Sequence, residues 1–290
     1  MPDALVVARA AALAGGAVAL EALHRPHEIA EKGRRADIVT EVDHASERAI
    51  VACLRASYPD AAIVTEEAGL LAGTSGERWI VDPIDGTTNY AHGYPIFCIS
   101  IAYERDGELE AAAIYAPTMN ELFLARCGGG ATLNDVPIAV STVDSVGAAL
   151  VCTGFHPADF ERNAGCFRVA SNRAQAVRRD GSAALDLAYV ACGRFDAFWE
   201  FDLHAWDVAA GTLLVREAGG RVTRADGSGS AVDAPSILAS NGLIHDEMLE
   251  VLASGCVMAS VATEGERSRA TDAMLGRGGS TPAPSRLRSP

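Results

Sequence analysis

Two aspartates interrupt an apolar run in the segment WIVDPIDGTTNY, residues 79–90. Asp82 directly follows three apolar residues, and Asp85 comes three residues later. The apolar run predicts a buried strand, and a carboxylate buried at its end needs a compensating charge. No Lys or Arg follows until Arg105, so the pattern favours a bound metal cation as that partner.

The ligands that this segment offers are hard oxygen atoms, which suit Mg²⁺, Mn²⁺ or Ca²⁺ better than zinc. Pro83 restricts the backbone of Asp82, and Gly86 lets the main chain approach a ligand closely. Thr87 and Thr88 are expected to begin a helix, whose free N–H groups form an anion site. The turn is therefore predicted to hold cations with its carboxylates and a phosphate group with its amides.

Further carboxylates stand at predicted strand ends and helix starts elsewhere in the chain. They are Asp43, Glu66, Glu67 and Asp207. A single acid at such a place is usually a helix cap or a partner of the helix dipole. The repeated occurrence of acids at such ends, together with Asp82 and Asp85, instead favours a cluster that binds metal ions.

The first half of the chain is expected to contain two helices and then a series of strands. The helices are expected at 4–23 and 44–57, with Asp43 as N-cap of the second and an irregular polar stretch over 28–43 between them. Strands are expected at 61–67, at 78–82 and, several in number, within 97–126, where Asp106-Gly107 predicts a hairpin turn.

After about residue 145, strands and helices alternate, which is typical of an α/β arrangement. The expected elements are strands at 149–155, 195–201 and the start of 237–254, and helices at 161–174, 182–193, 205–220 and the end of 237–254. We predict an N-terminal α+β part over 1–145 and a C-terminal α/β part over 146–262. Residues 263–290, rich in Gly, Ser, Pro and Arg, are predicted to be a disordered tail.

The overall charge limits the class of partner. The 290 residues include 38 Asp and Glu against 24 Lys and Arg, a formal net charge of −14. Such a chain repels nucleic acid and anionic membranes, which argues against direct binding of either. A small phosphorylated substrate remains compatible with this charge if a cation sits in the site.

Cysteine usage and the N-terminus both predict a cytoplasmic protein. The seven cysteines are odd in number and form no CxxC pair, which favours reduced, buried thiols over disulfides or zinc ligands. The apolar N-terminus lacks a basic start and is interrupted by Arg9 and Glu21, so it predicts a helix packed on the domain. No uninterrupted apolar stretch has the length of a membrane span.

Four segments together resemble the inositol monophosphatase family of Mg²⁺-dependent, lithium-sensitive phosphatases. They are DIVTEVD (37–43), IVTEE (63–67), WIVDPIDGTTNYAHG (79–93) and WDVAAGTLLVREAGG (206–220). The resemblance implies a layered αβαβα fold. It also implies an inositol-1-monophosphatase-like phosphoric monoester hydrolase that acts on myo-inositol 1-phosphate or related sugar and polyol monoesters.

By this resemblance, two or three Mg²⁺ ions lie in the site. Glu66, Asp82 and the carbonyl of Ile84 are implied for one ion, and Asp82, Asp85 and Asp207 for a second. A third, weaker ion is implied at Glu66 with water. Two ions about 4 Å apart can activate a water molecule and stabilise the leaving oxygen of a phosphoester.

The resemblance also assigns the groups around the phosphate and the alcohol. Asp43 with Thr87 would orient and deprotonate the attacking water, while the amides of Gly86 and Thr87 bind phosphate, so that no phosphoenzyme forms. The implied alcohol side consists of Gly181, Ser182, Ala183 and Glu200, with Lys32 as a basic residue near the site. Asp180 adds negative charge on this side, so the identity of the substrate is not decided. His204 and Trp206 are expected to have a structural role.

Several alternatives stay open at this point. Histidinol-phosphate phosphatase and fructose-1,6-bisphosphatase are alternative activities within the same chemistry. A 3′-phosphoadenosine 5′-phosphate phosphatase fits less well, because such enzymes usually carry Lys where Thr88 stands. Some bacterial relatives instead act as binding proteins in transcription antitermination. Homodimers are common in the family, although the sequence shows no interface.

Overall fold

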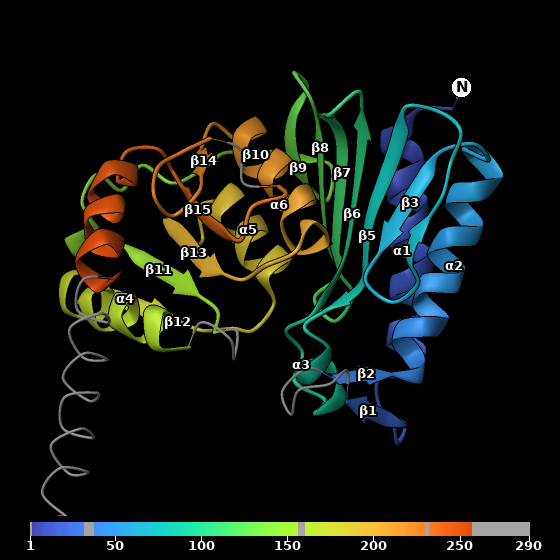
Figure 1. The fold of residues 1–290 in the computed structure, drawn as a ribbon, viewed down its shortest axis with the longest axis horizontal. Coiled ribbons are helices and arrows are strands. Elements are labelled where there is room, and N and C mark those ends of the chain that lie inside the picture. The colour runs from blue at the N-terminus through green and yellow to red at the C-terminus, as the bar shows by residue number, and fades with distance from the viewer. Residues whose placement is uncertain (1, 32–37, 156–159, 230–231, 257–290) are drawn as a thin grey trace, which may run out of the picture.

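Five layers of helices and sheets stack in the order α, β, α, β, α (Figure 1). The structure is a computed structural model that describes residues 2–31, 38–155, 160–229 and 232–256. The stacking confirms the layered αβαβα fold that the sequence predicts. Lys32 and the predicted tail lie outside the described residues, and the division of the chain near residue 145 stays a prediction.

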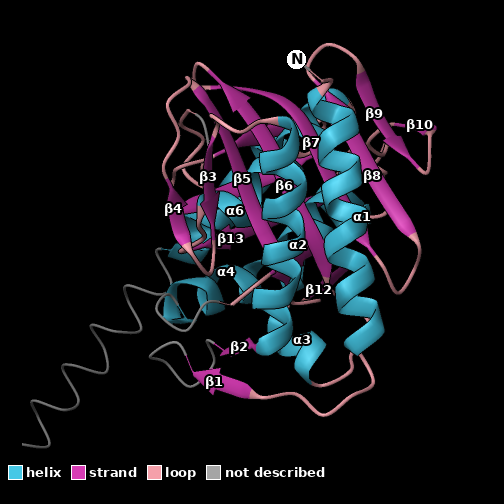
Figure 2. Cartoon of the chain, turned by 90° about the vertical axis from the view of Figure 1, so that its right-hand side faces the viewer, coloured by secondary structure: helices cyan, strands magenta, loops and turns pink. Residues whose placement is uncertain are grey.

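Two long helices, α1 (Ala4–Ala22) and α2 (Glu41–Ser57), form the first layer and lie side by side across the larger sheet (Figure 2). A glycine permits this close approach, because a Cβ on Gly15 would lie 2.7 Å from the side chain of Ile50 on α2. The buried face of α1 carries small side chains such as Ala8 and Ala11. Small side chains let a helix axis lie near its neighbours, and here they join both helices and the sheet in one core.

Helix α1 is long and apolar enough, by length and composition, to cross a membrane, and no other helix among the described residues is. Arg9 and Glu21, which the sequence analysis counts as interruptions, do not remove it from this class. In the structure, however, Val7, Ala12 and Ala19 of α1 are buried in the core shared with α2 and the sheet. This packing identifies α1 as a core helix, as expected from the sequence.

The larger sheet has eight strands in the order β10-β9-β8-β7-β6-β5-β3-β4, and β3 and β5 are its one parallel pair. The strands are β3 (Ala62–Thr65), β4 (Gly69–Leu71), β5 (Glu77–Asp85), β6 (Cys98–Arg105), β7 (Glu108–Ala116), β8 (Glu121–Arg126), β9 (Gly130–Leu133) and β10 (Val136–Ile138). The predicted hairpin turn is confirmed: Asp106 and Gly107, at φ 52° and 84°, join β6 to β7.

Two helices, α5 (Ala183–Ala191) and α6 (Ala205–Glu217), fill the space between the two sheets. All residues of α5 and the central residues of α6, 208–215, are buried, so neither helix has a wide polar face. They pack tightly on each other, because a Cβ on Gly211 of α6 would lie 2.4 Å from the side chain of Leu187 on α5. A helix that is apolar on all faces is buried on all faces, so the apolar composition of these two segments indicates that they lie between the sheets.

The smaller sheet has the order β12-β11-β13-β15-β14, preceded by a short 3₁₀ helix, η1 (Val146–Ala148). The strands are β11 (Leu150–Thr153), β12 (Ala176–Arg178), β13 (Ala197–Phe201), β14 (Arg221–Thr223) and β15 (Ser236–Ser240). Helix α4 (Phe160–Arg173) and a helix over 245–256 cover its outer face. The predicted helices and strands of this half are present, while the short edge strands β12 and β14 were not predicted.

The start of α2 corrects a prediction. Thr40, not Asp43, is the N-cap, and Asp43 is the third helical residue, where it completes a capping box with Thr40. The stretch predicted to be irregular contains two short paired strands, β1 (Ile29–Glu31) and β2 (Ile38–Thr40). The hydroxyl of Thr40 caps the helix. The reciprocal hydrogen bonds of the capping box hold the Asp43 side chain beside Thr40.

No cysteine among the described residues is in a disulfide. Cys98, Cys152 and Cys166 are buried, whereas Cys127 is exposed, so the expectation of burial fails there. Cys127 follows the end of β8 in a surface turn, where its main-chain N–H donates to the carbonyl of Glu110. The position of Cys127 in the turn between β8 and β9, not the residue type, decides this exposure.

Candidate active site

Strand β5 carries both aspartates of the opening motif to one end of the larger sheet. Side chains three residues apart on a regular strand point to opposite faces. Here Asp82 pairs with Ser100 and Asp85 with Cys98, so β5 contains one extra residue and forms a bulge between them. The bulge shifts the alternation by one residue and brings both carboxylates to the same side.

Helix α6 brings a third carboxylate to this point. Carboxylate oxygens of Asp82, Asp85 and Asp207 all lie within 4.8 Å of one another. Oδ2 of Asp207 accepts a hydrogen bond of 2.7 Å from the main-chain N–H of His204, which fixes the side chain at the first turn of α6. The ring of His204 stacks on Trp206 at a centroid distance of 4.7 Å, consistent with the structural role expected for both.

Burial makes this group of negative charges unfavourable without a cation. Asp82 is 2 % exposed and Asp85 is 7 % exposed. Burial raises the pKa of Asp82 well above its ordinary value, and the charges of Glu66, Asp85 and Asp207 raise it further. Burial also raises the pKa of Asp207 well above its ordinary value, with a further contribution from the charge of Asp85. Such groups must either hold protons or bind cations.

Asp85 is more strongly held by its neighbours than Asp82. Its Oδ2 accepts hydrogen bonds from the Ser182 hydroxyl at 2.6 Å and from the Ala184 N–H at 2.8 Å. Burial raises the pKa of Asp85 to about 6, and these two bonds oppose the rise. Ser182, which is predicted to face the substrate, therefore also orients a carboxylate of the cluster together with Ala184.

The donor set fits the hard divalent cation that the sequence predicts. All three converging atoms are carboxylate oxygens, the ligand type that Mg²⁺ prefers. The nearest arginine in the sequence, Arg78, does not supply the counter-charge, because it pairs with Glu104 at 2.7 Å and Asp233 at 3.6 Å. A cluster of this composition is a candidate Mg²⁺ site.

The other two predicted ligands lie beside the cluster. Glu66 is outside the group within 4.8 Å, but it is close enough that its charge raises the pKa of Asp82. Its main-chain N–H donates to the Val81 carbonyl at 3.3 Å, which ties the end of β3 to β5. The Ile84 carbonyl lies 3.0 Å from the Thr87 hydroxyl.

Asp43 and Thr87 meet although 44 residues separate them, as predicted. The Thr87 hydroxyl donates to Oδ1 of Asp43 at 3.0 Å and is equally close to the Ile84 carbonyl, so one hydrogen serves two acceptors. Oδ2 of Asp43 accepts from the N–H of Thr40 at 2.9 Å and from its hydroxyl at 2.5 Å. Asp43 has no exposed surface and is therefore rigidly oriented.

The turn after Asp85 requires glycine. Gly86 has φ +96°, and a Cβ there would lie 3.1 Å from the carbonyl oxygens of Gly181 and Ile96. Helix α3 (Thr87–Ala91) begins at the next residue, as predicted. The sequence gives no sign of the role of Asn89 on α3. Its amide donates to the Ile96 carbonyl at 2.7 Å and to the Asp180 carbonyl at 2.8 Å, linking the turn to the segment 180–183.

Glu200 lies on the predicted alcohol side, on strand β13. It is 8 % exposed, and burial first, then the charge of Asp85, raises its pKa to about 8. Gly154 lies directly against the Glu200 carboxylate, because a Cβ there would overlap both carboxylate oxygens. Strand β13 therefore places a buried acid within electrostatic reach of the Asp82 cluster.

Comparisons with known proteins agree with this geometry. A sequence model of the inositol monophosphatase family matches residues 3–257. The chain belongs to the inositol monophosphatase family. It is 42 % identical over 254 residues to an inositol-1-monophosphatase of Synechocystis sp., a match that covers 86 % of this chain and 88 % of that protein.

Other relatives of this inositol monophosphatase family member carry a different name. The chain is 44 % identical over 251 residues to a Nus factor SuhB of Pseudomonas aeruginosa, covering 83 % of this chain and 92 % of that protein. The crystal structure of extragenic suppressor protein suhB from Bartonella henselae superposes with a TM-score of 0.83 at 38 % identity, covering 85 % of this chain and 97 % of that one. Family membership supports a phosphatase, with a small phosphorylated substrate.

Glu47 of α2 is a residue of this family member that the sequence analysis missed. Its Oε2 accepts hydrogen bonds from the Thr65 hydroxyl and from the N–H groups of Glu67 and Ala68, at 3.2 Å and 3.1 Å for the two amides. These bonds surround Glu66 in the turn after β3. The only sign of this role is that a buried carboxylate accepts hydrogen bonds from a neighbouring loop. That contact is a property of the folded chain and cannot be recognised in a single sequence.

Replacing Glu47 by alanine is expected to weaken Mg²⁺ binding by about 10- to 100-fold, the usual cost of losing a group that orients a metal ligand. Glu47→Gln, which keeps one acceptor oxygen, should lie between the alanine variant and the unchanged protein. Electron paramagnetic resonance of free Mn²⁺ measures the affinity without turnover. Equal Mn²⁺ affinity in all three proteins, with only the melting temperature lowered, would contradict this role for Glu47.

Mg²⁺ is expected to stabilise the protein more at about pH 8 than at about pH 5.5. The folded-state pKa values of Asp85, about 6, and Glu200, about 8, exceed the ordinary values of 3.8 and 4.5. The folded metal-free protein thus binds more protons than the unfolded chain, and its stability falls as pH rises through this range. Bound Mg²⁺ neutralises the carboxylates that have lost their protons. The stabilisation by Mg²⁺ therefore increases as the pH rises and these groups deprotonate.

Differential scanning fluorimetry with Mg²⁺ or a chelator at both pH values measures this difference. Asp144→Asn, a change at an exposed acid outside the cluster, is the matched control and should behave like the unchanged protein. An equal Mg²⁺-dependent rise in melting temperature at both pH values would contradict the expected coupling between protons and metal.

Proposed function

We propose that this chain is a Mg²⁺-dependent phosphatase that hydrolyses myo-inositol 1-phosphate or a related sugar or polyol phosphomonoester. The observation that carries the proposal is the convergence of Asp82, Asp85 and Asp207 within 4.8 Å, next to the hydrogen-bonded pair Asp43 and Thr87. Binding metal ions beside a positioned acid-base group is what hydrolysis of a phosphomonoester by water requires.

The cluster would hold two or three Mg²⁺ ions, with Glu66 and the Ile84 carbonyl as additional ligands. Bound Mg²⁺ supplies positive charge that lowers the pKa of water and offsets the negative charge of a phosphoryl group. Asp85 reaches the site already oriented by Ser182 and Ala184, so little side-chain entropy is lost when it binds a cation.

Asp43 accepts the proton of the attacking water in this proposal. Its Oδ2 is occupied by two hydrogen bonds from Thr40, which leaves Oδ1 to face Thr87 and the water. The Thr87 hydroxyl can turn its hydrogen to the Ile84 carbonyl, and its oxygen then accepts from the water. The two side chains thereby fix both the position and the orientation of the nucleophile.

The turn formed by Gly86 and Thr87 offers main-chain N–H groups to the phosphate. The alcohol group would face Gly181, Ser182, Ala183 and Glu200. Because the Ser182 hydroxyl donates to Asp85, we assign Ser182 chiefly to holding that carboxylate. Glu200 is then the group on this side that accepts hydrogen bonds from a polyol.

A panel of phosphomonoesters assayed with and without Mg²⁺ tests the proposed activity. The panel comprises myo-inositol 1-phosphate, histidinol phosphate, fructose 1,6-bisphosphate and 3′-phosphoadenosine 5′-phosphate. Glu200→Gln is expected to raise KM for the inositol ester about tenfold with little change in kcat, because a uniform binding contact is removed. A histidinol phosphate kcat/KM that is orders of magnitude higher would replace the proposed substrate, and inertness towards all four would reject the phosphatase.

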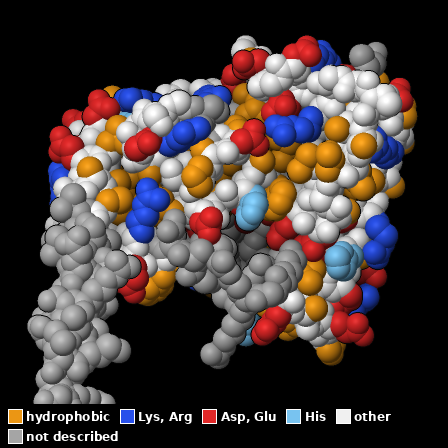
Figure 3. Space-filling view, in the orientation of Figure 1, with side chains coloured by type: hydrophobic (Ala, Val, Ile, Leu, Met, Phe, Trp, Pro, Cys, Tyr) orange, Lys and Arg blue, Asp and Glu red, His pale blue; other side chains and the backbone are white. Residues whose placement is uncertain are grey.

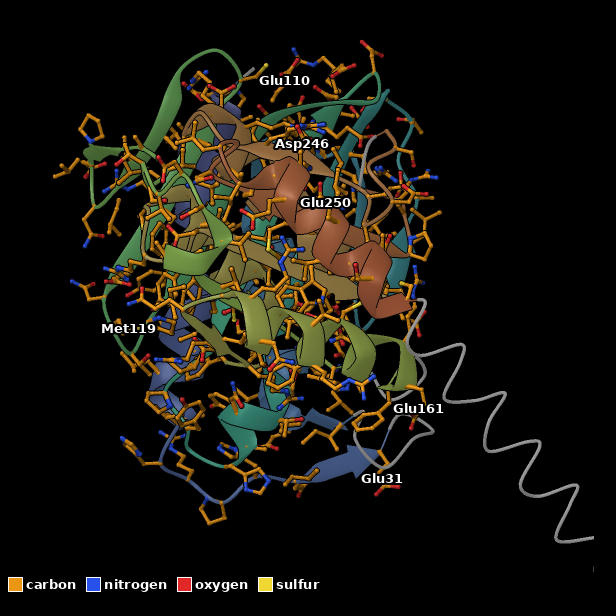
Figure 4. The ribbon with its side chains drawn as sticks, turned by 90° about the vertical axis from the view of Figure 1, so that its left-hand side faces the viewer. Glu31, Glu110, Met119, Glu161, Asp246 and Glu250 are labelled. Carbon is orange, nitrogen blue, oxygen red and sulfur yellow. The ribbon has the colours of Figure 1, made fainter. Side chains whose placement is uncertain are left out.

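A role in transcription antitermination is a second candidate, favoured by the relatives named Nus factor SuhB. Basic and acidic side chains are interspersed over the face in Figure 3, and the net charge is −14. Three of the acids labelled in Figure 4, Glu31, Glu161 and Glu250, lie on separate elements of the molecule. Such a surface suits contact with another protein better than with RNA. Homodimerisation and a cytoplasmic location stay predictions.

Asp82→Asn separates the two candidate functions. The variant loses the predicted metal site but keeps the outer surface, so a binding role would survive in cells that lack the hydrolytic activity. Complementation of a strain deleted for its own SuhB-type protein is the measurement. Rescue by the variant supports a binding role, and failure of a stably folded variant supports the hydrolytic one.

A further inference from the structure

A second group of metal-ligating side chains lies outside the Asp82 cluster. Atoms of Cys152, Asp180 and Asp186 all lie within 4.8 Å of one another. They come from strand β11, from the loop that precedes α5 and from the first turn of α5. Cys152 and Asp186 are buried, and Asp180 is partly exposed, so one side of the group can be reached from solvent.

Asp186 is the member of the group that calls for a ligand. It is 1 % exposed, and its Oδ1 has no hydrogen-bond partner among the described residues. Burial, followed by the charge of Asp180, raises its pKa well above the ordinary value, while a hydrogen bond from the Cys152 thiol opposes the rise. A buried carboxyl oxygen without a partner is costly, so the site favours a group that would satisfy it.

The surrounding charges are predominantly negative. Glu200 and Asp85 both add to the rise in the pKa of Asp186. Burial raises the pKa of Asp180, and the charge of Arg178 only opposes this rise. Arg178 is exposed, and its guanidinium donates to the Val177 carbonyl at 3.2 Å. The interior of the group therefore carries more carboxylates than cationic side chains, as expected for a cation site.

The chemistry of the three donors differs from that of the Asp82 cluster. A cysteine sulfur beside two carboxylates is a borderline-soft set, which suits Zn²⁺ or Cd²⁺ and does not suit Mg²⁺. Ligands of tetrahedral zinc lie about 3.5 Å apart, given metal–ligand distances of about 2.0–2.3 Å. Side-chain movements of about 1 Å would convert the present spacing into three ligands, with water as the fourth.

We propose that Cys152, Asp180 and Asp186 form a second divalent cation site, selective for thiophilic ions such as Zn²⁺. On binding, the Cys152 thiol and the Asp186 carboxyl lose their protons to solvent, and sulfur–metal and oxygen–metal bonds form without any change in oxidation state. This inference does not depend on the proposed phosphatase activity, because binding is measured directly.

The position of this site gives it a route to influence the alcohol side. Gly154 follows the end of β11, two residues after Cys152, and the charge of Glu200 reaches Asp186, whose pKa it helps to raise. Gly154 lies against the Glu200 carboxylate. A cation held at Cys152 would therefore stabilise the charged form of Glu200 and would change substrate KM more than kcat.

Titration of the chelator-treated full chain with Co²⁺ or Cd²⁺ tests the proposal through the thiolate-to-metal charge-transfer absorption. One equivalent per chain is expected to produce this band in the presence of excess Mg²⁺. Cys152→Ser should abolish the band, while Cys127→Ser, at the exposed thiol, should leave it unchanged. A band that survives Cys152→Ser, or the lack of any stoichiometric band, would overturn the proposal.

Asp180→Asn is the second variant, because Asp180 is partly exposed and its change is tolerated more easily than one in the core. It should weaken Cd²⁺ binding by about tenfold, consistent with loss of one ligand of three. Unchanged affinity would overturn the assignment even if Cys152→Ser does not fold. Asp82→Asn should keep the band, and its loss in that variant would place the cation in the Asp82 cluster instead.

Discussion

Replacing Asp82 by asparagine is expected to lower kcat/KM by at least about a thousandfold while raising the melting temperature of the metal-free protein. Loss of about 4 kcal/mol of charge stabilisation in the transition state corresponds to that factor. Asp82 is the central acid of the cluster, because the charges of Glu66, Asp85, Asp207 and Asp43 all raise its pKa. Removing its charge therefore relieves repulsion in the empty site and removes a metal ligand at once.

The opposite signs of these two effects make the test specific. A defect in folding would lower activity and stability together, whereas loss of a metal ligand lowers activity alone. Phosphate release and scanning fluorimetry on the same preparation measure both quantities, with Asp144→Asn as the matched control. A variant that keeps more than about a tenth of the activity would show that Asp82 does not hold a catalytic ion.

Asp43→Asn is expected to lower kcat by about 10²- to 10⁴-fold, the usual contribution of a general base. The amide cannot accept a proton from the attacking water, although its oxygen can keep one of the bonds from Thr40. Because Asp43 also completes the capping box of α2, a loss of about 1 kcal/mol in the free energy of unfolding should accompany the change.

Two variants of Thr87 separate the catalytic part from the structural part. Thr87→Ser keeps the hydroxyl that bonds to Asp43 at 3.0 Å and should retain most of kcat. Thr87→Val removes it and should lower kcat towards the Asp43→Asn value without disturbing the cap on Thr40. Single-turnover kinetics with saturating Mg²⁺ measures the chemical step. If Thr87→Val matches the unchanged enzyme, the pair does not orient the water.

Local signals in the sequence were sufficient for most elements. Apolar periodicity located helix α2, largely apolar composition indicated α1, α5 and α6, and Asp106-Gly107 marked a hairpin. These signals work because a few neighbouring residues decide a turn or an amphipathic face. Short edge strands such as β12 and β14 were missed because three residues carry too little periodicity.

The candidate site divides in the same way. The sequence determined the residue types of the Asp82–Asp85 turn and the spacing of its carboxylates. Both are properties of one short segment. The sequence also identified the family, because four motifs in order are specific. The N-cap of α2 was misplaced by three residues, since Thr40 and Asp43 are both good caps and only the packed chain selects between them.

What the tertiary structure decided is how these groups meet. The bulge in β5 brings Asp82 and Asp85 to one side, and α6 adds Asp207 from more than 120 residues away. Glu47, Asn89 and the group around Asp186 have no signature in the chain, because their roles come from contacts with distant loops. A sequence determines which side chains are available, whereas sheet register and helix packing determine which of them share a buried space.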